Sequence, residues 1–497
     1  MGGAVTKWTM TYEAPANGSS PYELPQPPSM EGLPEEVHAY CAQLTNMISL
    51  LLEELKELKG RLSKNSSNSG KPPSSDREGK TPKTKSQRGK SGKRPGGQSG
   101  RKGKNLQSVD NPDHIVHHFP ESCQSCGHAL DAVEARCAES RQVFEMPEPK
   151  LEVTEHRVYE TSCSCCGCKS KASFPTGIEA HTQYGHHARA LMAYLHNQHL
   201  IPVERVSRLF QDLFGYTVSP GTITQVNIRL FDHLESFEKA LQVHLLASTL
   251  LHFDETGVRC NKKLQWVHVA SSAKATLYHT HLKRGQEGME AGGILGLFQG
   301  VGVHDHLHSY FAYPEMRHAL CNAHHLRELT FIDEQEKEPW AIKLKKILLQ
   351  MKEETEAYRH EGTVPEETVN RLTKEYASIV LEGFLYHCQL PPLPKNKRGR
   401  RKQRPGKNLL VRLIDDRQCV LRFLNDLSVP FTNNQAERDL RMIKVQQKVS
   451  GCFRTPTGAT MFCRIRSCIS SVRKQGWNIL KTLATALSNP NLLPSLS

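Results

Sequence analysis

The stretch that most constrains the fold of this chain is "KNSSNSGKPPSSDREGKTPKTKSQRGKSGKRPGGQSGRKGKN", residues 64–105. It holds 13 Lys or Arg residues against two acidic residues and no large apolar side chain, so it cannot bury a hydrophobic core. It divides the 497-residue chain and carries most of the formal charge of +14. We predict a disordered basic linker over 63–108 that binds phosphate groups without reading a base sequence.

The segments before this linker differ sharply from each other. Residues 1–32 are rich in Pro, Gly and Ser, and we expect them to be disordered. Residues 33–62 instead carry apolar side chains at alternating spacings of four and three, namely Val37, Cys41, Leu44, Ile48, Leu51, Leu55, Leu58 and Leu62. This heptad pattern predicts a coiled coil that joins protomers. The alternative is an amphipathic helix that packs on its own domain.

The composition excludes a membrane protein and favours a nucleic-acid partner. No run of about 18 apolar residues is present, so no membrane span is expected. The start, MGGAVTKWTM, lacks the apolar core of a signal peptide, and we interpret its match to the myristoylation pattern as chance. A strongly basic chain suits an anionic partner such as DNA. We expect a cytoplasmic, nucleoid-associated protein.

A cysteine-rich segment at 109–178 predicts a structural Zn²⁺ site. Its two clusters are "CQSC" and "CSCCGC", which supply Cys123, Cys126, Cys163, Cys165, Cys166 and Cys168. Two CxxC pairs about 40 residues apart make a plausible tetrahedral thiolate site. We favour Cys163 and Cys166 as the second pair, with Cys168 as the substitute. The alternative is a set of buried cysteines without a metal.

Residues 179–245 are expected to be helical. In "PVERVSRLFQDLF" the apolar side chains share one face, Gly215 permits a turn, and Ser219 with Pro220 has the pattern of an N-cap and first helical residue. Helix, short turn and helix is the outline of a helix-turn-helix DNA-binding region. An ordinary helical hairpin fits the pattern equally well.

Residues 247–310 change to short segments rich in Val, Leu and aromatic residues. "STLLHFDETG", "LQWVHVASS", "ATLYHTH" and "GVGVHDHL" predict four strands, with a helix at "EAGGILGLFQG" before the fourth. Residues 315–390 and 433–488 return to helical patterns. The fold class is therefore multidomain α+β.

Three carboxylates stand out in this part of the chain. Asp254 and Asp305 each follow an apolar run, as expected at the ends of central strands, and Glu437 lies on a predicted helix. Carboxylates from two strands and a helix can hold two divalent cations, and hard oxygen ligands suit Mg²⁺ or Mn²⁺. The alternative is that they only solvate strand ends or pair locally, for example Asp254 with Arg259. Glu255 should point to the face of the strand opposite to Asp254.

At these residues the chain resembles DDE transposases of the insertion-sequence-sixty-six family, the large transposase subunit of such bacterial elements. The resemblance runs through nearly the whole chain, in matching order and spacing. The segments that carry it are "RLSKNSSNSGKPPSSD", the Cys pairs, "FPTGIEAHTQYGHHARALMAYLHNQHLIPVERV", "LFGYTVSPGTI", "HFDETGVR", "LQWVHVASS", "HLKRG", "GVGVHDHLHSY", "LCNAHHLREL" and "VPFTNNQAERDLRMIKVQQKVSGCFRT".

The resemblance implies a ribonuclease-H-like catalytic domain over 246–450, with a helical insertion at about 311–430 and a C-terminal helical region at 451–497. Asp254, Asp305 and Glu437 match the three catalytic acids. Within the insertion, "LCNAHHL" matches the family's CxxH motif at Cys321 and His324, for which a metal, a packing role or a DNA contact is open. Two departures concern specificity: Asp305 is followed by His306 and Leu307, and "KVQQKVSGCFRT" replaces an Arg-Lys-Asn run.

The resemblance further implies a DNA transposase that cuts element ends and joins the 3′ hydroxyl to target DNA with two Mg²⁺ or Mn²⁺ ions. Arg284, Arg438 and Lys448 are candidate phosphate contacts. The expected partners are element ends and target DNA, a second copy through the coiled coil, and small accessory proteins of the same element. Two alternatives remain: a zinc-dependent DNA-binding regulator derived from an inactive transposase, and a nuclease that does not join strands.

Overall fold

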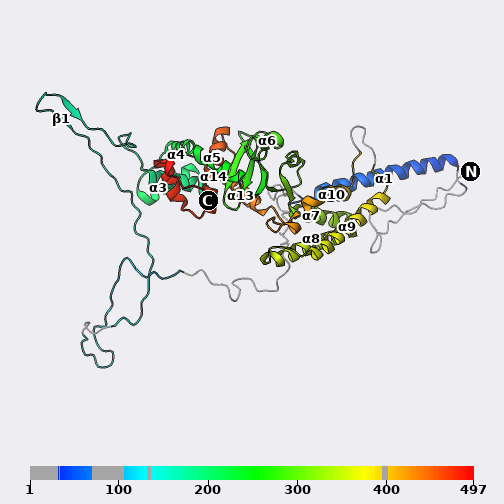
Figure 1. Cartoon of the computed structure of the whole chain (residues 1–497), viewed down its shortest axis with the longest axis horizontal. Helices are drawn as coiled ribbons and strands as arrows, with labels where there is room; N and C mark the ends of the chain where they lie inside the picture. The colour runs from blue at the N-terminus through cyan, green and yellow to red at the C-terminus, as the bar shows by residue number, and fades with distance from the viewer. Residues whose placement is uncertain (1–31, 33, 70–105, 131–135, 394–400, 497) are drawn as a thin grey trace, which may run out of the picture. The chain divides into compact units, whose positions relative to one another are not determined.

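The computed structural model describes residues 32, 34–69, 106–130, 136–393 and 401–496 (Figure 1). Residues 1–31, which were predicted to be disordered, and most of the predicted basic linker lie outside these residues. The chain forms two compact units, which we call the helical unit (1–85, 303–306 and 318–433) and the sheet unit (86–302, 307–317 and 434–497). Among the described residues, no helix is long and apolar enough to cross a membrane.

A five-stranded sheet with the order β5-β4-β3-β6-β7 organises the fold. Its strands are β3 (Leu250–Cys260), β4 (Lys263–Ser271), β5 (Thr276–His281), β6 (Val301–His304) and β7 (Arg317–Leu320). β4 pairs antiparallel with both β3 and β5. The β3–β4 hairpin turns at Asn261 and Lys262, whose positive φ angles of 45° and 64° match the right-handed twist of the strands.

The strand predictions hold for β3 to β6, but two other predictions in this region are wrong. "EAGGILGLFQG" is not a helix: α6 (Gln286–Glu290) ends at its first residue, and turns and bends follow. A Cβ on Gly292 would lie only 2.4 Å from the His279 ring. Glycine at this position therefore lets the backbone pass close to that ring. β7 was expected to be helical; its few residues show no clear alternation.

The helices of the sheet unit pack partly on its strands and partly on one another (Figure 1). They are α2 (His186–Ala193) with the π-helical turn η3 (Tyr194–Gln198), α3 (Val203–Phe214), α4 (Pro220–His233), α5 (Glu235–Leu246), α13 (Asn434–Ser450), α14 (Pro456–Lys474) and α15 (Ile479–Ser488), with the 3₁₀ turns η4 (His308–Ala312) and η6 (Pro490–Leu492). α13 packs on β3 and β4, and α14 packs along β5. The C-terminal helices therefore complete the same core as the sheet.

The predicted turn between α3 and α4 is confirmed. Gly215 ends α3 in the left-handed region with φ of 73°, and Ser219 caps α4 by accepting a hydrogen bond from the Thr222 amide at 3.0 Å. Pro220 occupies the first helical turn. On the buried side, α4 packs against α2, α14 and α15, while Thr224 and Gln225 face solvent.

The helical unit is built mainly of the helices that lie between β7 and α13 in the chain. Its helices are α7 (Asn322–Glu336), α8 (Pro339–Ala357), α9 (Glu366–Gln389), α10 (Pro405–Asp415), α11 (Arg417–Val420) and α12 (Arg422–Asn425), with the 3₁₀ turn η5 (Tyr358–His360). α7, α8, α9 and α10 pack against one another (Figure 1).

The unit also contains α1 (Glu35–Ser63), the predicted heptad helix, whose apolar side chains at Leu51 and Leu55 are exposed. The start of the basic linker is ordered, contrary to prediction. Asn68 is 2% exposed; its side chain binds the Ser63 carbonyl at 3.1 Å and reaches Glu334 of α7 at 3.4 Å. Lys64 lies over the Phe331 ring at 5.0 Å.

Candidate active site and metal-binding residues

Asp254 and Glu437 belong to the same side of the sheet. On β3 successive side chains alternate between faces, and the unbroken register pairs Asp254 with Val269 of β4. Val269 shares a core with Ala436, the residue before Glu437 in the first turn of α13. Phe253, one position earlier on β3, packs in a different core. The first and third candidate acids therefore face the same layer, between the sheet and α13.

The position of Asp254 along its strand differs from the prediction. β3 continues to Cys260, so Asp254 lies within the strand and does not end it. The strand continues because every residue from His252 to Cys260 has a partner on β4. Asp254 and Glu437 are both half-buried, which leaves their carboxylates within reach of small ions.

Glu255 has a different environment from its neighbour, as expected from strand alternation. Its side chain is fully buried; it pairs with Arg284 at 2.7 Å and accepts a hydrogen bond from the Tyr310 hydroxyl at 2.7 Å. The Arg284 guanidinium also lies over the Trp266 ring, 5.1 Å from its centroid. Glu255 is thus held by side chains of its own unit.

Asp305 directly follows β6, the strand next to β3 in the sheet order. A row of hydrogen-bonded polar side chains fixes the residue after it. His306 contacts Asp416 at 2.7 Å and His325 at 3.1 Å, and His325 contacts Asn322 at 3.0 Å. Burial lowers the pKa of His306, against the opposing effect of Asp416. Sequence patterns could not find this row, because its members lie up to 110 positions apart.

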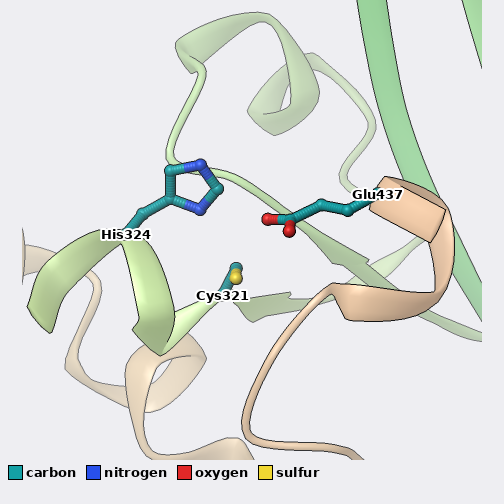
Figure 2. Close-up of side chains that lie close together, drawn as sticks. All are labelled: Cys321, His324 and Glu437. Atoms are coloured by element: carbon teal, nitrogen blue, oxygen red, sulfur yellow. The ribbon is translucent and has the colours of Figure 1, made fainter. Parts of the chain in front are cut away.

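Cys321 and His324 lie together at the start of α7, as the CxxH spacing predicts (Figure 2). A ligand atom of each lies within 4.8 Å of the other. The Cys321 thiol accepts a hydrogen bond from the Asn433 amide at 3.1 Å, whereas His324 Nδ1 is buried and has no hydrogen-bond partner among the described residues. Burial lowers the pKa of His324 to about 3, which keeps the ring neutral. Figure 2 also draws Glu437, which belongs to the sheet unit.

The two cysteine clusters form matching turns. Cys123 donates its amide to the His128 carbonyl at 2.8 Å and accepts from Gly127 at 2.9 Å; Cys163 does the same with Cys168 and Gly167 at equal distances. Backbone amides in each turn lower the pKa of the first thiol, Cys123 or Cys163.

The second turn connects the two strands of a short antiparallel hairpin, β1 (Glu160–Ser162) and β2 (Lys169–Lys171). By position in the matching turns, Cys166 corresponds to Cys126, and Cys168 follows the turn. Among the described residues, the four favoured thiols do not gather into a cluster of metal-ligand spacing.

The three candidate DNA contacts differ in exposure. Arg438 and Lys448 are exposed on α13. Arg284 is instead engaged with Glu255 and Trp266, and its side chain is 43% exposed. On the described structure, Arg284 therefore has a structural partner that the sequence did not reveal.

A buried polar network behind α13 was also missed by the sequence. Asp439, two residues after Glu437, receives a 2.8 Å ion pair from Lys474 and a 2.6 Å hydrogen bond from Ser271. Burial lowers the pKa of Lys474, while Asp439 acts in the opposite direction. These residues come from α13, α14 and β4, so only the fold brings them together.

Comparison with known families agrees with this architecture. A family described as "Transposase IS66 family", with a DDE domain, matches residues 181–461, and the "zinc-finger binding domain of transposase IS66" matches residues 120–167. A family of unknown function, DUF6444, matches residues 25–107. No curated protein matches the chain. The first match covers more than half of the sequence, and the chain belongs to the IS66 family of DDE transposases.

Proposed function

We propose that this chain cuts the ends of its own DNA element and joins the freed 3′ hydroxyl to target DNA. The observation that carries the proposal is the placement of Asp254 and Glu437 toward one layer of the sheet unit. Asp305 would complete the set. The amide of Val301, the first residue of β6, donates to the carbonyl of Thr249, the residue before β3, at 2.8 Å. Asp305 lies four residues after Val301, and Asp254 lies four residues after Leu250. The two acids are therefore equally far along their strands.

The donor atoms of these residues fit two Mg²⁺ or Mn²⁺ ions. Carboxylate oxygens are the hard ligands that both ions prefer, and all three side chains are half-buried. When bound, two such metal ions act as Lewis acids that activate an attacking oxygen and stabilise the leaving oxygen. In this proposal, the side chains of Asp254, Asp305 and Glu437 hold the two metal ions.

The chain's own residues would bind and orient DNA, while water and a DNA hydroxyl supply the nucleophiles. Hydrolysis of a phosphodiester at the element end would leave a 3′ hydroxyl, which then attacks a target phosphodiester and displaces another 3′ oxygen. No covalent enzyme intermediate is needed, so no Ser or Tyr nucleophile is assigned. Exposed Arg438 and Lys448 lie on the helix of Glu437, where cations would attract the phosphate backbone.

The remaining assignments concern binding and assembly. Zn²⁺ would join the two cysteine turns through Cys123, Cys126, Cys163 and Cys166, because soft thiolates suit Zn²⁺ and the turns match each other. α3 and α4 would bind DNA as a helix-turn-helix. The exposed seam of α1 would pair with a second copy, so that two element ends are held together. Small accessory proteins of the same element would join the assembled complex.

A donor plasmid carrying the DNA that flanks this coding sequence on both sides tests the proposal. Full-length protein with Mn²⁺ should release 3′ hydroxyl ends and join them to a second plasmid. Asp254→Asn should lower both reactions by at least about 100-fold, because a metal ligand is lost. Glu375→Gln, which neutralises an exposed carboxylate of α9, is the matched control and should leave both unchanged.

The other outcomes distinguish the alternatives. Binding of the flanking DNA without cleavage at any metal concentration would indicate a regulator. Cleavage without joining would indicate a nuclease. Cleavage that is insensitive to Asp254→Asn would refute the assigned site.

A further inference from the structure

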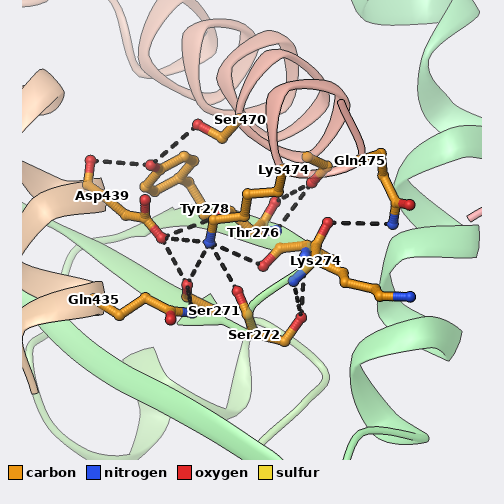
Figure 3. Close-up of polar contacts among 12 residues, drawn as sticks. Ser271, Ser272, Lys274, Thr276, Tyr278, Gln435, Asp439, Ser470, Lys474 and Gln475 are labelled. Carbon is orange, nitrogen blue, oxygen red and sulfur yellow. Dashed lines mark hydrogen bonds and ion pairs between the residues drawn. The ribbon is translucent and has the colours of Figure 1, made fainter. Parts of the chain in front are cut away.

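We infer that Asp439 and Lys474 form a buried lock that sets the rotation of α13 and thereby positions Glu437. The inference rests on the proposed function of Glu437 as a metal ligand. Neither residue touches the proposed reacting atoms, so both are positioning residues. Figure 3 shows the contacts that carry the inference.

The lock begins at the outer edge of the sheet. Among the described residues β5 is an edge strand paired with β4, and α14 supplies hydrogen-bond partners on its other side. The amides of Thr276 and Tyr278 donate to the hydroxyls of Ser471 and Ser467 at 2.9 and 2.8 Å. The two serines are one helical turn apart, and Lys474 continues the same stripe of α14. The stripe fixes α14 along β5 and delivers Lys474 to the β4–β5 turn.

At that turn the ammonium of Lys474 is enclosed by acceptors. It donates to the Ser271 hydroxyl at 2.8 Å, to the Ser272 carbonyl at 2.9 Å and to Asp439 at 2.8 Å, with the Ala275 carbonyl at 3.3 Å (Figure 3). The side chains of Lys474 and Asp439 are only 17% and 16% exposed. A pair so enclosed is weakly screened, and each charge depends on the other.

Asp439 is held from several directions at once. Besides Lys474, its carboxylate accepts from Ser271 at 2.6 Å and Thr276 at 3.2 Å, and its backbone carbonyl accepts from the Tyr278 hydroxyl at 3.0 Å. One helical turn earlier, Gln435 donates to Ser271 at 3.0 Å. The N-terminal half of α13 is therefore tied to β4, β5 and α14 along one edge.

The position of this edge explains why it controls Glu437. Ala436, Leu440 and Ile443 form the apolar stripe of α13. At 3.6 residues per turn, Asp439 and Glu437 flank that stripe on opposite sides, about 160° apart. An apolar stripe alone tolerates a small roll of the helix, because its contacts have no direction. The hydrogen bonds of Asp439 oppose such a roll.

A small roll would be costly for catalysis. The Glu437 carboxylate lies several ångströms from the helix axis, so a roll of about 10° would move it by about 1 Å. A displacement of that size can lower a rate by about 100-fold. We therefore expect the lock to act on metal affinity and rate more than on the presence of the fold.

The test compares Asp439→Asn and Lys474→Met with Arg473→Ala, which removes a neighbouring exposed cation from the same end of α14. Amide hydrogen exchange of metal-free protein over 434–441 should be at least about 10-fold faster in the first two variants and unchanged in the control. Their Mn²⁺ affinity, from calorimetry, should fall by about 10-fold or more. Unchanged exchange and unchanged affinity in both variants would overturn the inference.

Two further variants keep the outcome interpretable. If Asp439→Asn does not fold, Gln435→Ala removes one bond of the same edge and should give a smaller change of the same kind; unchanged exchange and affinity there would also overturn the inference. Glu437→Gln tests the proposed function by itself. Faster exchange in the lock variants, with Mn²⁺ binding unaffected by Glu437→Gln, would refute Glu437 as a ligand and leave the mechanical role of the lock supported.

Discussion

Arg284 was a candidate phosphate contact, yet the structure gives it a structural role that can be measured. Arg284→Ala would leave the Glu255 carboxylate, which is fully buried, without its ion-pair partner. Breaking a buried pair costs about 3–5 kcal/mol of folding free energy. Solvent reaches the guanidinium, which is 43% exposed, so we expect the lower end, about 3 kcal/mol. Loss of the contact between Arg284 and the Trp266 ring would lower the free energy of unfolding further.

Companion variants separate the charge from the contacts. Glu255→Gln keeps a partner for the Tyr310 hydroxyl and should cost less, about 1–2 kcal/mol. Glu255→Gln combined with Arg284→Met should cost less than the sum of the single changes, because no unpaired charge remains. Lys283→Ala is the matched control: its ion pair with Glu287 is mostly exposed and should be worth less than about 1 kcal/mol.

Urea unfolding followed by circular dichroism gives these free energies, and DNA binding at several salt concentrations gives the competing readout. A phosphate contact predicts the opposite pattern for Arg284→Ala, with unchanged stability and a salt dependence reduced by about one counterion. That pattern, or a loss of stability no larger than in Lys283→Ala, would refute the structural role.

Three further predictions concern zinc, packing and pH. Cys166→Ser should abolish stoichiometric Zn²⁺ in the purified protein and Cys168→Ser should retain it, as measured by atomic emission; the reverse would overturn the choice of ligands. Gly292→Ala should lower the free energy of unfolding by about 1–3 kcal/mol, because a Cβ there meets the His279 ring at 2.4 Å; an unchanged urea midpoint would contradict this packing. Burial lowers the pKa of His268 and of His279 to about 4. Between about pH 6.5 and pH 4 the unfolded chain therefore binds more protons than the folded chain. The free energy of unfolding should decrease as the pH is lowered from 6.5 to 4. A flat profile of the urea midpoint over this range would refute the pH prediction.

Much of the fold could be predicted from local chemistry. Strand composition located β3 to β6, and Ser219 with Pro220 marked the start of α4, because these signals act over a few residues. β7 was missed because its four residues are too few to show alternation. The glycine-rich stretch after α6 was mistaken for a helix, because the ring that Gly292 accommodates comes from β5, which sequence spacing does not reveal.

The candidate site was predicted unevenly. Asp254 and Glu437 were identified largely through family resemblance, and the structure adds why they face one layer: strand alternation and the packing of α13. Asp439 and Lys474 had no sequence signal. They are 35 residues apart and meet only because α14 lies along the edge of β5.

The central claim is that Asp254, Asp305 and Glu437 hold the same divalent ions, and calorimetric titration of metal-free protein with Mn²⁺ tests it most directly. We expect about two ions per chain. Asp254→Asn, Asp305→Asn and Glu437→Gln should each remove an ion or weaken binding by at least about 10-fold, whereas Glu375→Gln should have no effect. Equal Mn²⁺ binding in the wild type and all three variants would contradict the account.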